Sequence, residues 1–95
     1  EEALAAQTEA PLTPVEMCAM MGGMATAVME GRQRGVAMST MMGVANTSDA
    51  TANALVTAMV ADAFDRPRFS TEAMQARAAE DFRAYVEAEC FRSTR

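Results

Sequence analysis

The sequence predicts an all-α fold, a small bundle of three long helices plus one short helix that is stapled by one disulfide. Hydrophobic residues make up 51% of the chain, with ten methionines among them and no tryptophan. This composition favours helices. Apolar residues recur at helical spacing in segments bounded by helix start and stop signals. Two cysteines, Cys18 and Cys90, lie near opposite ends of the predicted domain, where one bond between them would close it.

The 95 residues are expected to form one folded domain preceded by a short leader. Residues 1–12 are interpreted as a flexible leader, because they carry no capping signal and Pro11 and Pro14 interrupt any helix. Residues 13–95 are interpreted as a single helical domain.

The stretch from Thr13 to Gly35 predicts the first long helix, over residues 13–34. Thr13 and Glu16 have the spacing of a capping box, in which each side chain accepts a hydrogen bond from the other residue's backbone N–H. Pro14 suits the first helical position. Gly35 can adopt the left-handed conformation that ends many helices, and the arginines of the last turn complement the helix dipole.

Three further elements follow along the chain. Residues 35–37 are predicted as a turn, and residues 38–45 as the short helix. Residues 49–64 are predicted as the third helix, with Ser48 or Thr47 as its cap. Its predicted apolar stripe consists of Ala52, Leu55, Val56, Met59, Val60, Ala63 and Phe64.

The fourth helix is predicted to begin after Ser70 as its cap, once Pro67 has ended the preceding element. Phe69 and Met74 have the spacing of a hydrophobic staple across this helix start. The predicted buried ridge of the helix is Ala78, Phe82, Val86 and Cys90, widened by Ala79, Tyr85 and Phe91. If Cys90 bonds Cys18, the first and fourth helices lie antiparallel.

The first helix also carries a ridge of small residues at a strict four-residue spacing. The ridge consists of Ala19, Gly23, Ala27 and Gly31. Small side chains at this spacing let another helix backbone approach closely, within one chain or between two. We therefore expect this ridge to be a helix-packing face.

The charge of the chain restricts its partners and its compartment. The net charge is −5, and the chain has eight arginines but no lysine or histidine. Such an acidic chain is a poor match for nucleic acid or anionic membranes, and the uncharged stretch from Met17 to Met29 is too short for a membrane span. Two cysteines in a small acidic chain and a first residue of Glu1 indicate an exported protein, periplasmic or secreted. Two free, buried thiols are the alternative to the disulfide.

Five sequence features together carry a family resemblance. They are Cys18, the stretch MEGRQRGVAMS from Met29 to Ser39, the stretch AFDRPRFS from Ala63 to Ser70, Phe82 and Cys90. In these features the chain resembles a group of small exported bacterial proteins that have two cysteines and no assigned function. The resemblance implies export, an all-helical fold and a disulfide, and it implies no catalytic residues. In architecture the chain also looks like small periplasmic inhibitors, such as immunity proteins, and like single-disulfide acid-stress chaperones.

Enzymatic activity is not expected. Without histidine and lysine, and with both cysteines in a disulfide, carboxylates and hydroxyl groups are the remaining candidates for general acid and base. The pair Asp62 and Asp65 and the pair Glu80 and Asp81 have arginine neighbours, so ordinary surface charge explains them. No residue is assigned as catalytic and no cofactor is predicted.

The methionines admit three interpretations. Thioethers are soft ligands that suit Cu(I) or Ag(I), so a soft-metal carrier is one alternative. Flexible methionines also fill irregular cores, and they line surfaces that accommodate protein partners. The candidate metal set is Met17, Met20, Met21, Met24, Met38, Met41 and Met42.

A second candidate site lies where arginines cluster near predicted helix ends. The possible site consists of Arg32, Gln33 and Arg34 together with the loop from Asp65 to Phe69, and its candidate partner-binding residues are Arg32, Arg34, Arg66, Arg68 and Phe69. Its arginines could present positive charge to an acidic partner, or could serve capping and turn formation. The leading hypothesis is a non-enzymatic exported binding protein that acts on a protein partner, as an inhibitor, or on itself as a homodimer. The alternatives are the soft-metal carrier and a holdase-type chaperone that exposes methionine surface at low pH.

Overall fold

The computed structural model describes residues 11–44 and 49–94, which form four α-helices and no strand. The all-α prediction and the disulfide are confirmed. The prediction of three long helices is imprecise, however. The four helices have 21, 7, 15 and 22 residues, and the third is intermediate in length. In chain order they are α2 (Pro14–Arg34), α3 (Met38–Val44), α4 (Ala50–Phe64) and α5 (Glu72–Ser93). The predicted leader lies outside the described residues apart from positions 11 and 12.

Helix α2 begins and ends where the sequence predicts. The backbone N–H of Glu16 donates to Thr13 Oγ1 over 3.1 Å, and the N–H of Thr13 donates to Glu16 Oε1 over 2.9 Å. The hydrogen bond from the Thr13 backbone N–H, and after it the Thr13 hydroxyl, hold the pKa of the Glu16 carboxyl below its ordinary 4.5. At the other end Gly35 has φ 89°, and its N–H donates to the carbonyl of Arg32 over 3.1 Å. The N–H of Val36 reaches the Gly31 carbonyl over 3.0 Å, which completes the expected helix stop.

The cap of α4 differs from the prediction. Asp49 is the N-cap, and its Oδ1 accepts hydrogen bonds from the N–H groups of Thr51 and Ala52 over 3.0 and 3.4 Å. A carboxylate can accept both free N–H groups of the first turn and adds a favourable charge at the positive end of the helix. The predicted caps Ser48 and Thr47 lie outside the described residues, as does Ala45, the predicted last residue of the short helix.

The start of α5 is one residue later than predicted. Thr71 is the N-cap in place of Ser70, and its Oγ1 accepts from the N–H of Met74 over 3.2 Å. In this register Met74 occupies the third helical position, so the staple predicted for Phe69 and Met74 is out of place. The Phe69 carbonyl instead accepts a hydrogen bond from Gln75 Nε2 over 2.8 Å, which fixes the chain just before the helix.

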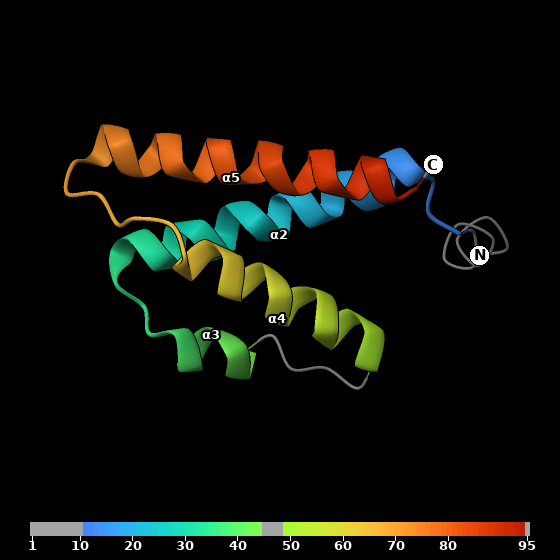
Figure 1. The fold of residues 1–95 in the computed structure, drawn as a ribbon, viewed down its shortest axis with the longest axis horizontal. Coiled ribbons are helices and arrows are strands. Elements are labelled where there is room, and N and C mark those ends of the chain that lie inside the picture. The colour runs from blue at the N-terminus through green and yellow to red at the C-terminus, as the bar shows by residue number, and fades with distance from the viewer. Residues whose placement is uncertain (1–10, 45–48, 95) are drawn as a thin grey trace, which may run out of the picture.

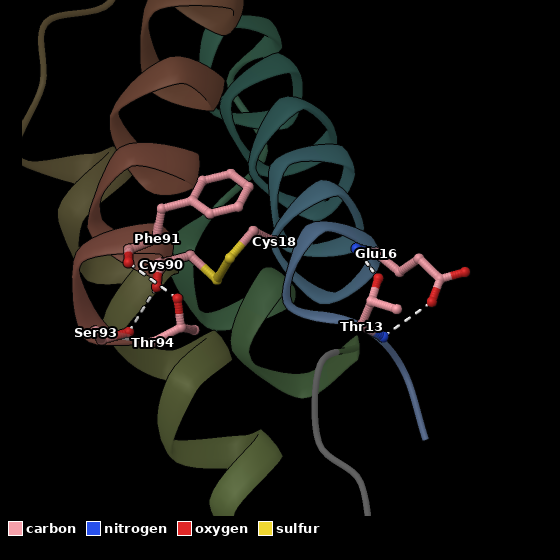
Figure 2. Close-up of a disulfide and its surroundings, with 7 residues drawn as sticks. All are labelled: Thr13, Glu16, Cys18, Cys90, Phe91, Ser93 and Thr94. Carbon is pink, nitrogen blue, oxygen red and sulfur yellow. Dashed lines mark hydrogen bonds between the residues drawn. A yellow bond between two sulfur atoms is a disulfide. The ribbon is translucent and has the colours of Figure 1, made fainter. Parts of the chain in front are cut away.

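Helices α2 and α5 form an antiparallel pair, and α4 lies across it (Figure 1). The amino end of α2 meets the carboxyl end of α5, where the Cys18–Cys90 disulfide joins them with a Cα–Cα distance of 5.5 Å (Figure 2). The carboxyl half of α4 packs against the pair, whereas its amino end diverges from α2. The core cluster consists of Ala25, Met29, Met59, Ala63, Ala79, Phe82 and Val86. No helix within the described ranges has the combination of length and apolar character that a membrane crossing needs.

The face of α2 that meets α5 is not the predicted small-residue ridge. The buried residues of this face are Cys18, Gly22, Ala25 and Met29. Of the predicted ridge, Gly23 is exposed with open space around it, and Gly31 is buried beneath the side chain of Met41 from α3. The two adjacent glycines therefore differ: a methyl group on Gly22 would meet the Glu87 side chain of α5, and a methyl group on Gly23 would meet nothing.

Substitution of alanine at these two positions should have different effects on stability. Gly23→Ala should raise the free energy of unfolding by about 0.5–1 kcal/mol, because alanine loses less backbone entropy in a helix and this site has room. Gly22→Ala should gain less or nothing, because its methyl group must displace Glu87 from its 2.8 Å ion pair with Arg83. Urea denaturation of both variants measures the difference. Equal gains would contradict the packing of α2 on α5 described here.

Candidate functional site

The predicted arginine cluster comes together around Gln33, which lies between Arg32 and Arg34 in the sequence. The side chain of Gln33 is 2% exposed, at the end of α2. Its Nε2 donates to the Pro67 carbonyl over 3.0 Å, and its Oε1 accepts from the Phe69 N–H over 2.7 Å. One amide therefore satisfies two backbone groups of the loop between α4 and α5, and it holds that loop on the end of α2.

Arg32 and Arg66 are two of the three predicted partner-binding arginines that make contacts within the chain. Arg32 donates from Nη2 to the Arg66 carbonyl over 3.1 Å, and its guanidinium lies 4.9 Å from the ring centre of Phe64. The guanidinium of Arg66 lies 5.0 Å from the ring of Phe82 and 4.6 Å from that of Tyr85. Stacking of this kind stabilises arginine against aromatic faces. These contacts anchor the loop to α5 and the end of α4.

The other members of the predicted cluster are not equivalent. Arg68 donates from Nε to the Gln33 carbonyl over 3.0 Å, and Phe69 is held through its backbone. Arg34 is exposed and makes no hydrogen bond or ion pair with any residue that the structure describes. The loop-anchoring role thus accounts for Arg32, Arg66 and Arg68. Binding of an acidic partner by this cluster stays a prediction.

The methionines of the candidate metal set lie outside the core. Met29 and Met59 are the buried methionines among the described residues. In the candidate set, Met17, Met20, Met24 and Met38 are exposed, and Met21, Met41 and Met42 are half-buried. Met24 and Met41 line one surface hollow and Met17 and Met21 line another, so the set is divided between two places. Soft-metal binding stays a prediction.

The first of these hollows, called the Arg34 hollow here, lies between α2, α3 and α4. Its volume is about 490 Å³. Its lining includes Met24, Ala27, Arg34, Thr40, Met41 and Val60. Gly31 also lines it, directly beneath the Met41 side chain.

The second, called the Tyr85 hollow here, lies between α2, α4 and α5 and has a volume of about 350 Å³. Three large apolar side chains from these three helices stand exposed at it: Met17 is 43%, Leu55 is 50% and Tyr85 is 41% exposed. Asp62 and Glu89 also line it, and so does Cys90 of the disulfide. Toward its amino end, α4 diverges from α2 (Figure 1).

Comparison with models of protein families, with curated proteins and with solved structures finds no match to this chain.

Proposed function

We propose that this protein acts by binding another protein chain at the Tyr85 hollow. The observation that carries this proposal is the convergence of Met17, Leu55 and Tyr85 from three separate helices, each exposed over roughly two fifths or more of its surface. Exposed apolar residues that cluster around a concavity mark interaction sites, and aromatic and methionine side chains are enriched in them. Single exposed apolar residues elsewhere on the surface need no such explanation.

The charges at the Tyr85 hollow favour a basic amphipathic helix as the partner. Among the described residues, Asp62 makes no ion pair and Glu89 pairs only with Arg92 of its own helix. The whole chain has a net charge of −5. The apolar face of an amphipathic helix fits the exposed apolar side chains of the Tyr85 hollow. Lysine or arginine beside that face fits the negative charge of Asp62 and Glu89.

The same charges favour a different protein over a second copy as the partner. In a twofold contact the same patch faces itself. Asp62 and Glu89 would then meet their own counterparts, and like charges brought together at an interface are unfavourable.

The disulfide supports the exported setting of this proposal. Such bonds persist in oxidising compartments and are rare where thiols are kept reduced. Cys18 and Cys90 are bonded across the ends of α2 and α5, and the described residues contain no free cysteine. The proposed place of action is therefore the periplasm or the extracellular space of a bacterium, as a non-enzymatic binding protein with the character of an inhibitor.

A pair of lysine variants tests the proposal. The probe is a fluorescent model helix with leucine on one face and lysine on the other, and its twin carries glutamate in place of lysine. We expect the basic probe to bind and the acidic twin not to bind. Leu55→Lys should weaken binding at least tenfold, because it puts a cation and a polar group in the contact. Fluorescence anisotropy measures both affinities.

Met74→Lys is the matched control. Met74 is 43% exposed, close to the 50% of Leu55, but it lines neither hollow. This variant makes the same change of charge and should leave the affinity for the basic probe within about twofold of the wild-type value. Equal losses in the two variants, or equal binding of the basic and acidic probes, would count against the site. Light scattering tests self-association. If the free protein is a dimer and Leu55→Lys dissociates it, the partner at this hollow is a second copy of the chain.

A further inference from the structure

The Arg34 hollow is a separate site with different chemistry. It lies on the other side of α4 from the Tyr85 hollow and is walled by α2, α3 and α4. Its volume of about 490 Å³ falls within the roughly 300–1,000 Å³ that small-molecule sites occupy. Its walls are predominantly apolar, with Met24, Val28, Val56 and Val60 among them.

Two polar side chains line this apolar space. Arg34 is the charged one, and the hydroxyl of Thr40 from α3 is the other. Unlike Arg32 and Arg68, which are bonded to the backbone of the chain, Arg34 has no partner among the described residues. An unpaired guanidinium beside an apolar hollow is complementary to a ligand with an anionic head and an apolar body.

We propose that the Arg34 hollow binds a long-chain fatty acid, with its carboxylate on Arg34 and its acyl chain against the methionine and valine walls. One guanidinium balances the single charge of a carboxylate. A phosphate monoester carries about −1.5 to −2 and would need further cations, which a chain with a net charge of −5 does not supply at this hollow.

The walls also distinguish an acyl chain from a peptide. A bound peptide brings an N–H and a C=O with every residue, and each of them needs a hydrogen-bond partner when it is buried. The walls are helices whose backbone groups are already paired along the helix, and the polar side chains of the lining are Arg34 and Thr40. An acyl chain has no such groups to satisfy.

The residues of α3 that close the hollow suit a ligand of variable shape. The methyl group of Met41 lies where a side chain at Gly31 would begin, so glycine lets α3 approach α2 there. Methionine has three rotatable bonds and adapts to the groups beside it. Met41 can therefore move with respect to Gly31 and fit the acyl chain without moving the core.

The test uses the full chain and two fluorescent probes below their micellar concentrations. These are cis-parinaric acid and its methyl ester, which has the same tail and no charge. The acid should bind saturably, with one site per chain. Arg34→Gln should weaken binding of the acid about tenfold and leave binding of the ester unchanged, because it removes one charge-assisted contact only.

Ala27→Phe should abolish binding of both probes, because Ala27 is exposed on α2 and lines the hollow, where the larger ring takes up the space. Ala19→Phe places the same ring on the same helix away from both hollows and should change neither affinity. Leu55→Lys should also leave binding of the acid unchanged, which separates this site from the proposed protein contact.

Three results would overturn the proposal. They are the absence of saturable binding of the acid, equal effects of Ala27→Phe and Ala19→Phe, and an equal effect of Arg34→Gln on the acid and the ester. Melting curves of all the variants establish that each one is folded under the conditions of the titration.

Discussion

Replacement of Cys18 and Cys90 by alanine should lower the free energy of unfolding by about 4 kcal/mol. The disulfide closes a loop between residues 72 positions apart, and the chain-entropy relation gives this value for a loop of that length. Domains are typically stable by only about 5–15 kcal/mol. A chain of 95 residues without its cross-link is therefore expected to be close to its unfolding threshold.

Guanidinium denaturation followed by far-UV circular dichroism measures the effect. Oxidised protein, protein reduced with a phosphine, and the double-alanine variant form the comparison. The reduced protein and the variant should agree in free energy of unfolding to within about 1 kcal/mol, because both lack the cross-link. The variant should be the less stable of the two, because it also removes two buried sulfur atoms. A loss below about 1 kcal/mol in both would show that the helices hold together without the bond.

Gln33→Ala should lower the free energy of unfolding by about 3 kcal/mol, although Gln33 lies in a polar stretch of the sequence. It leaves the carbonyl of Pro67 and the N–H of Phe69 without their partners, and a buried polar group without a partner costs about 1–3 kcal/mol. It also removes the contact between Gln33 and Met29 in the core. Denaturation by urea gives the value. Arg34→Ala, at the exposed neighbouring position, is the control and should cost less than about 1 kcal/mol.

Gln33→Glu sharpens this experiment because it keeps the shape of the side chain. A glutamate at this site is ionised at neutral pH, cannot donate to Pro67, and carries its charge where the native side chain is 2% exposed. Burial favours its neutral form, which regains an O–H donor. The variant should therefore be closest to the wild type near pH 4 and lose stability relative to it toward pH 7. A difference that does not change with pH would contradict the hydrogen bond to Pro67.

The helix ends were predictable where the signal is local. The Thr13–Glu16 box and Gly35 need only residues within one turn, and the structure has both. The start of α5 was predicted one residue early, because Ser70 and Thr71 are both good caps and Gln75 decides between them by binding the Phe69 carbonyl. The choice depends on a side chain whose role cannot be inferred from a local pattern.

The face of α2 that packs against α5 shows a second limit of prediction from the sequence. The predicted small-residue ridge of α2 runs through Gly23, whereas the face of α2 that is buried runs through Gly22. The disulfide requires the face of Cys18, which carries Gly22, to lie on α5. The pairing of the cysteines therefore determines that Gly22, and not Gly23, is the buried glycine.

The candidate site was the least predictable part. Leu55 belongs to the predicted apolar stripe of α4, yet it is 50% exposed because the helix diverges from α2 toward that end. Tyr85 was placed on a widened core ridge and instead lines a hollow. The angle between two helices sets both outcomes, and periodicity within one helix carries no information about that angle.

The closeness of Cys18 and Cys90 has a consequence for how the domain can be joined to others. The chain enters the helix pair and leaves it at the same end of the molecule, through positions that a covalent bond already holds at a Cα–Cα distance of 5.5 Å (Figure 2). Such an arrangement lets a folded unit be spliced into a surface loop of a host protein without stretching either of them. The domain is thereby suited to insertion into a host protein, with the Tyr85 hollow, which Cys90 and Thr94 line, beside the point of attachment and the Arg34 hollow farther along the helix pair.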